Sequence, residues 1–179
     1  MNVTQGKEIL EKSLIDGQGS PLPILANLSA HISNELSRLN IPINWCGFYT
    51  NNKSNLALIL TTFSIGKPAC VRLNLDTKKA KIFGVCAAGI FEKKTVYVSD
   101  VHNRDGHIAC DEASKSELVV PVFDKNERAI AVLDIDCPVL DGFGGENAKI
   151  VAGQIEELID WVNDNAADIR WNEFRNTLL

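Results

Sequence analysis

Two pairs of apolar segments, each joined by a short polar turn, constrain the fold of this chain most strongly. "INWCGFYT" (43–50) and "LALILTTF" (56–63) flank the turn "NNKSN", and "LVVPVF" (118–123) and "AIAVLDID" (129–136) flank "DKNE". Apolar and aromatic runs of this length, separated by a few turn-forming residues, are typical of β-hairpins. The sequence therefore predicts an antiparallel sheet, to which "CVRLNL" and "TVYVSD" add two short strands.

Helical patterns stand before and after these hairpins. Helices are expected over 5–16 and 21–39, and the second repeats leucine and isoleucine at three- and four-residue steps along one face. "GVCAAGIFEKK" (84–94) reads as a short helix, and a last helix is expected from about Glu146 to Asp164. The pattern indicates an α+β fold, with a central antiparallel sheet and helices packed on one side.

Length and composition favour a single domain. The chain has 179 residues, of which 45% are hydrophobic, and no stretch rich in Pro, Gly or Ser divides it. We expect one domain over 1–179 with its core at about 20–164. Residues 5–16 and the tail 165–179 are extensions, and the tail is expected either to continue the last helix or to fray.

Charge and hydropathy exclude several classes of partner. The formal net charge is −5 and the basic pairs are isolated, whereas a nucleic-acid surface needs clustered lysine and arginine. No apolar segment approaches the roughly 18 residues of a membrane span, and the N-terminus lacks a signal-peptide pattern. We therefore expect a cytoplasmic protein that binds small molecules or other proteins rather than nucleic acid or a membrane.

The five cysteines indicate thiol chemistry rather than a structural framework. Their number is odd, their spacing is irregular and no C-x-x-C occurs. His102, His107, Cys110 and Cys86 match no zinc-binding spacing, so we expect neither a metal nor an organic cofactor. Cys46 and Cys137 are interpreted as packed thiols without a role in chemistry.

Paired carboxylates are the first candidate site. Side chains alternate along a strand, so Asp134 and Asp136 share one face while Leu133 and Ile135 point to the other. Glu117, at the start of the preceding strand, could face the same space. Three converging carboxylates would suit an ammonium ligand and would keep at least one proton at neutral pH. The alternative interpretation is that this alternation belongs to a strand with one face exposed to solvent, and the pattern alone favours neither.

Aromatic residues and three cysteines complete the candidates. Trp45 and Tyr49 could close a pocket over a ligand, although aromatic residues in strands are more often core. An irregular crossing over 100–117 is longer than most loops in compact domains, which favours a function for Cys110, close to His107. Cys70 and Cys86 also lie at the ends of elements. The helix start at Cys86 is expected to lower its pKa.

Five motifs in this order are similar to those of the free methionine-(R)-sulfoxide reductases, which are single GAF domains. They are "NWCGFY", "GKPAC", "GVC", "DVHNRDGHIACDEASKSELVVPV" and "VLDID", and the resemblance spans about 20–160. It implies a GAF-like domain with a loop-rich ligand pocket on the side of the sheet away from its helices. It also implies thioredoxin-dependent reduction of free L-methionine (R)-S-oxide, a role in oxidative stress, and allows a homodimer.

The resemblance also assigns residues. Cys110 matches the nucleophile, Cys70 the cysteine that resolves its sulfenic acid in a redox-active disulfide, and Cys86 a third, auxiliary cysteine. The positions that surround the substrate are matched by five residues: Trp45, Tyr49, Glu117, Asp134 and Asp136.

The link between Cys70 and Cys86 is longer than in the family, and "GVCA" replaces "GVCG". Cys86 therefore remains an alternative to Cys70 as the resolving thiol. Two other functions also stay open, namely a non-catalytic GAF-type sensor of a small molecule or oxidant, and a scaffold or binding protein.

Overall fold

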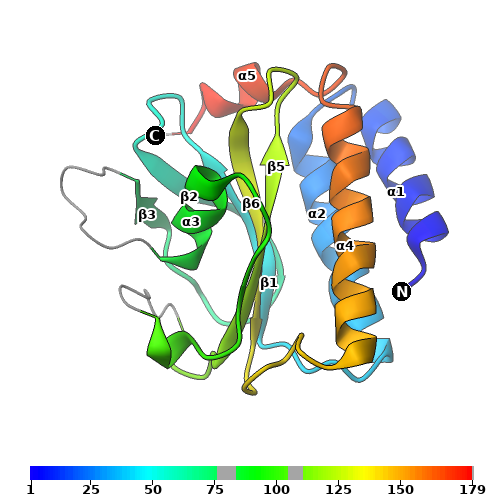
Figure 1. Ribbon diagram of the computed structural model, residues 1–179. Coiled ribbons are helices and arrows are strands. Elements are labelled where there is room, and N and C mark those ends of the chain that lie inside the picture. The colour runs from blue at the N-terminus through cyan, green and yellow to red at the C-terminus, as the bar shows by residue number, and fades with distance from the viewer. Residues whose placement is uncertain (76–83, 105–110, 179) are drawn as a thin grey trace.

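The structure is a computed structural model, and it describes residues 1–75, 84–104 and 111–178 (Figure 1). One sheet has the strand order β3-β2-β1-β6-β5-β4, and all neighbouring strands are antiparallel. The two expected hairpins are β1–β2 and β5–β6. The strands are β1 (Trp45–Asn51), β2 (Ala57–Ile65), β3 (Arg72–Asn74), β4 (Val96–Val98), β5 (Ser116–Phe123) and β6 (Ala129–Cys137).

Two long helices, α2 (Pro21–Arg38) and α4 (Glu146–Asp164), cover one face of this sheet, and α1 (Val3–Asp16) packs on their outer side (Figure 1). A short helix, α3 (Val85–Glu92), lies on the other face. Pro21 suits the first turn of α2, where a backbone N–H is not needed. The expected α+β class is confirmed, with α3 as the described helix on the pocket side.

The main core lies between the sheet and the long helices. Leu28 and Ile32 of α2 and Leu158 of α4 are buried against Leu133 and Ile135 of β6. On the other face α3 packs very close to the strands. Gly89 permits this approach, because a Cβ at that position would lie only 2.8 Å from Cγ1 of Val119 on β5. The apolar residues of α3 other than Phe91 are buried there and belong to a second, smaller core.

The tail neither continues α4 nor frays. The chain turns after α4 and forms a separate short helix, α5 (Trp171–Arg175). Arg175 is buried and donates hydrogen bonds to the backbone carbonyls of Asn51, the last residue of β1, and Asn52, the next residue, at 2.8 and 3.0 Å. None of the helices in the described parts of the chain is long and apolar enough to cross a membrane.

Candidate active site

Strand register places the predicted carboxylates in one cluster. Glu117 on β5 pairs with Asp136 on β6, which in turn pairs with Trp45 on β1. Asp134 precedes Asp136 by two residues on β6, so it points to the same face of the sheet, and it pairs with Gly47 of β1. The three carboxylate residues are only 5% to 8% exposed, so the alternative of a solvent-facing strand is wrong. They lie on the face of the sheet opposite the core residues Leu133 and Ile135.

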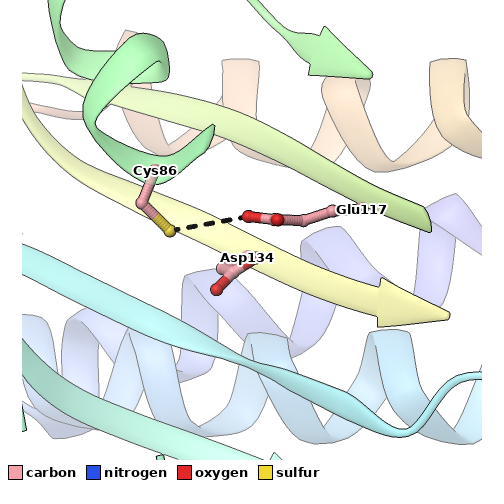
Figure 2. Close-up of side chains that lie close together, drawn as sticks. All are labelled: Cys86, Glu117 and Asp134. Carbon is pink, nitrogen blue, oxygen red and sulfur yellow. Dashed lines mark hydrogen bonds between the residues drawn. The ribbon is translucent and has the colours of Figure 1, made fainter. Parts of the chain in front are cut away.

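Helix α3 adds a thiol to this cluster. Cys86 lies in its first turn, and its Sγ donates a hydrogen bond to Oε1 of Glu117 at 3.9 Å (Figure 2). One ligand atom each from Cys86, Glu117 and Asp134 lies within 4.8 Å of the other two. These side chains line a pocket whose wall also includes Leu73 and Ser114.

Burial makes these carboxylates weak acids. It raises the pKa of Asp134 to about 6. Burial, together with the nearby charge of Asp134, raises the pKa of Asp136 to about 8. The pKa of Glu117 lies well above its usual range for the same reasons. The cluster therefore holds protons near neutral pH, and it can act either as an acid or, once ionised, as a receptor for a cation.

The expected lowering of the Cys86 pKa is wrong. Complete burial, and then the charges of Asp134 and Glu117, raise the pKa of this thiol well above its usual value. These effects outweigh the positive end of the short helix, because a thiolate here would be both desolvated and next to anions. Cys86 is therefore a poor nucleophile in this setting.

The two aromatic residues stack beside the carboxylates. The rings of Trp45 and Tyr49 have centroids 5.7 Å apart with planes 27° from parallel, and both side chains are buried. Gly47 lies between them on β1, and a Cβ there would be 2.5 Å from Cη2 of Trp45. The missing side chain lets the indole lie across the strand. The hydroxyl of Tyr49 donates to the backbone carbonyl of Cys70 at 2.9 Å.

The remaining cysteines fall into three groups. Cys46 and Cys137 are buried free thiols on the helix-covered face, where burial raises the pKa of each to about 12, as expected for packed cysteines. Cys70 is half-buried between β2 and β3 and is disulfide-bonded. The predicted nucleophile Cys110, and His107, lie outside the described residues.

The thiol of Cys86 and the carboxylates of Glu117 and Asp134 are close enough together to contact one cation. A metal would require Cys86, Glu117 and Asp134 all to lose protons, which their raised pKa values oppose. His102 is exposed, and its Nδ1 lies 3.0 Å from Oδ1 of Asp100. Among the described residues the donor set therefore suits an ammonium group better than a transition metal, which prefers imidazole or thiolate ligands.

The sequence interpretation missed a polar chain that leads to Asp136. Asn44, just before β1, donates through Nδ2 to Oδ2 of Asp111 at 3.2 Å and to Oγ of Ser114 at 2.9 Å. Ser114 in turn hydrogen-bonds the Asp136 carboxylate, which favours the ionised form and so opposes the rise of its pKa. The only sequence feature that could have indicated this polar chain is Ser114 in the long crossing, and a serine in a loop is too common to be informative by itself.

Comparison with known proteins identifies the family. No family model matches the chain. The "Free methionine-R-sulfoxide reductase" of Saccharomyces cerevisiae is 38% identical over 144 residues, which cover 76% of each protein. A solved GAF domain shares 36% identity with a TM-score of 0.72, covering 89% of this chain and 88% of that one.

A second solved structure, of the Staphylococcus aureus fRMsr in complex with substrate, is also 36% identical, with a TM-score of 0.70 and coverage of 92% of this chain and 95% of that one. Identity and coverage of this extent agree with the five sequence motifs and with the cluster of buried carboxylates beside stacked aromatic residues. The chain belongs to the free methionine-R-sulfoxide reductase family and has its GAF fold.

Proposed function

We propose that this protein reduces free L-methionine (R)-S-oxide to L-methionine. The observation that carries the proposal is the buried cluster of Glu117, Asp134 and Asp136 beside the stacked rings of Trp45 and Tyr49. Methionine sulfoxide offers an ammonium group for the former, and the methylene and methyl groups of its side chain for the latter. The names of the yeast relative and of the substrate-bound Staphylococcus aureus structure support the same substrate.

The carboxylates have two tasks in this reaction. Ionised, they bind the α-ammonium group, because a buried anion is stabilised by a cationic partner. Protonated, one of them donates a hydrogen bond to the sulfoxide oxygen and makes the sulfur electrophilic. The raised pKa values of Asp134 and Asp136, about 6 and about 8, leave both forms accessible near neutral pH.

Cys110 is the proposed nucleophile. Its thiolate attacks the sulfoxide sulfur, the oxygen passes to the cysteine sulfur with uptake of a proton, and methionine leaves with a two-electron gain. The product on the enzyme is a sulfenic acid. No metal or organic cofactor takes part in this scheme.

Cys70 is the proposed resolving thiol. Its sulfur attacks the sulfenic acid of Cys110, an S–S bond forms, the S–O bond breaks and water leaves. Two observations favour Cys70 over Cys86. Cys70 is disulfide-bonded, whereas Cys86 is a free, fully buried thiol with a raised pKa.

Peptide mapping by mass spectrometry after one turnover without reductant tests this choice. We expect a Cys70–Cys110 disulfide in the wild type and a persistent sulfenic acid on Cys110 in Cys70→Ser. A Cys86–Cys110 disulfide, with Cys70 still open to alkylation, would refute the assignment.

Thioredoxin is the proposed reductant of this disulfide, in the cytoplasm. A coupled assay with thioredoxin, thioredoxin reductase and NADPH should sustain turnover, and the Cys70→Ser variant should stop after one methionine. The homodimer is a separate expectation, which sedimentation equilibrium measures directly.

One assay separates the enzyme from a non-catalytic sensor. Reduced protein is incubated with racemic methionine sulfoxide and dithiothreitol, and free methionine is quantified. An R-specific reductase leaves half of the sulfoxide behind, whereas a GAF-type sensor binds sulfoxide and releases no methionine.

A further inference from the structure

The segment "GKPACV" (66–71), which carries Cys70, is held in place by contacts that involve no sulfur atom. Nζ of Lys67 lies 3.1 Å from Oδ1 of Asp111. The Tyr49 hydroxyl holds the Cys70 carbonyl, and the N–H of Leu60 donates to the carbonyl of Val71 at 3.0 Å. None of these contacts uses the sulfur of Cys70, which is disulfide-bonded in this structure.

The segment contacts both aromatic residues of the proposed substrate site, Trp45 and Tyr49. Gly66 has a φ of +121°, which favours glycine, and a Cβ there would collide with Cδ1 of Trp45 and lie 2.7 Å from the carbonyl oxygen of Asn44. The Cys70 segment therefore rests on Trp45 at one end and on Tyr49 at the other.

Asp111 is a fixed anchor for Lys67. Its side chain is 10% exposed, whereas that of Lys67 is 72% exposed. Its Oδ1 also accepts from the N–H of Ala113 at 3.1 Å, and its Oδ2 accepts from Asn44. These contacts hold the pKa of Asp111 below its usual value, so the carboxylate stays ionised.

Asp111 is also the residue that follows Cys110 in the sequence. The ion pair thus joins the segment that carries Cys70 to the covalent neighbour of the proposed nucleophile. Through Asn44 and Ser114, the same anchor is connected to Asp136 in the pocket.

We propose that Lys67 is a positioning residue for the resolving step, and that its ion pair with Asp111 keeps Cys70 close to the sulfenic acid of Cys110. This inference rests on the proposed function. The chemistry is the condensation given above, in which a thiol and a sulfenic acid yield a disulfide and water. Lys67 changes no bond; it raises the fraction of time in which the two sulfur atoms are within reach.

The test measures the two half-reactions separately in wild type, Lys67→Gln and Lys67→Arg. Reduced protein without reductant is mixed with excess methionine sulfoxide, and methionine and disulfide are followed by rapid quench, with dimedone to trap sulfenic acid. Lys67→Gln should form the disulfide about fivefold more slowly, the upper end for an exposed ion pair, while its first methionine appears at the wild-type rate. Lys67→Arg should restore the rate of disulfide formation.

Salt provides a readout that a merely structural role would not move. Because salt screens ion pairs, 0.5 M NaCl should slow disulfide formation in wild type but not in Lys67→Gln. Lys12→Gln is the control for removal of a lysine charge, since the Lys12 side chain is as exposed as that of Lys67 and lies 3.0 Å from Asp16, in α1. That variant should behave as wild type in every measurement.

The outcomes distinguish this inference from the function on which it rests. If the wild type releases no methionine, the proposed function fails and this inference with it. If the wild type releases methionine but Lys67→Gln forms the disulfide at the wild-type rate, or retains the wild-type salt dependence, the inference alone is overturned.

Discussion

The two faces of the sheet are built from the same strands, and both are buried. They differ in the polarity of the side chains that they bury. On the face covered by the long helices, Leu133 and Ile135 are fully buried among apolar side chains. On the other face, Asp134 and Asp136 are almost as deeply buried, and Oδ1 of Asp134 has no hydrogen-bond partner among the described residues.

This difference separates stability from function within one strand. The helix-covered face is packed mainly from apolar side chains and needs no ligand. Buried carboxylates on the pocket face reduce stability unless they stay protonated or meet a cation. The pocket face therefore gains most from binding an ammonium group, and changes on the two faces should affect different measurements.

The largest expected effect distinguishes a reactive cysteine from a packed one. Cys110→Ser should abolish methionine production, because a serine hydroxyl is not ionised at neutral pH and cannot accept the sulfoxide oxygen as a sulfenic acid. Cys137→Ala, on the helix-covered face, should keep the turnover of folded protein while lowering its melting temperature. Both are measured by methionine release and by thermal unfolding monitored by circular dichroism. Methionine production by Cys110→Ser would remove Cys110 from the mechanism.

Blocking the ammonium group of the substrate should have the next largest effect. N-acetylmethionine sulfoxide cannot form charge-assisted hydrogen bonds with the carboxylates, each worth about 1.5 to 3 kcal/mol, so every such bond that is removed should lower kcat/KM about 10- to 100-fold. Steady-state assays on the free and acetylated R epimers measure this. Equal kcat/KM values would contradict the proposed ammonium site.

A paired substitution in β6 tests the two faces directly. Asp136→Asn keeps the shape of the side chain but removes its charge, so kcat/KM should fall about tenfold while stability at pH 8 is kept or increased. Leu133→Ala should lower the free energy of unfolding by about 2 to 5 kcal/mol and leave kcat/KM per folded molecule nearly unchanged. Urea denaturation and initial rates measure both. The comparison fails if Asp136→Asn destabilises the protein as much as Leu133→Ala does.

Local patterns in the sequence were sufficient for much of the fold. Alternation in 129–136 correctly separated the carboxylates from the core residues, and the apolar stripe of the last helix gave its bounds as Glu146–Asp164. The tail could not be predicted in this way. Arg175 is buried because it binds carbonyls about 120 positions earlier in the chain, which no local pattern encodes.

The site shows the same division. The alternation of side chains along the strands, together with the family motifs, predicted which carboxylates and aromatic residues lie close together. The Cys86 pKa was wrong because the argument considered only its own helix, while the dominant effects come from burial and from carboxylates on β5 and β6. Asn44 and Ser114 were missed because their importance depends on Asp111 and Asp136, which only the fold brings to them.

The smallest expected effect is a pH dependence of stability that originates on the pocket face. The folded protein keeps protons on Asp134 and Asp136 up to pH values of about 6 and about 8, whereas in the unfolded chain these groups ionise near pH 4. The unfolded state therefore binds fewer protons, and the free energy of unfolding of the ligand-free protein should fall as pH rises from 5 to 8, by about 1.4 kcal/mol per pH unit for each carboxyl group that still holds its proton in the fold.

Carboxylates with lowered pKa values, such as Asp124, act in the opposite direction but only below about pH 4, outside this range. The test compares urea denaturation of wild type, Asp136→Asn and Leu133→Ala at pH 5, 6, 7 and 8, so that the contribution of the pocket face is read as a difference between variants. Asp136→Asn should show the shallower decline, because one of the three carboxyl groups with a raised pKa is gone, whereas Leu133→Ala should run parallel to wild type at lower stability. Saturating methionine should also flatten the wild-type curve, since its ammonium group compensates the ionised carboxylates. A wild-type stability that rises with pH over this range, or equal slopes for wild type and Asp136→Asn, would show that the pocket face is not the electrostatically incomplete side of the sheet.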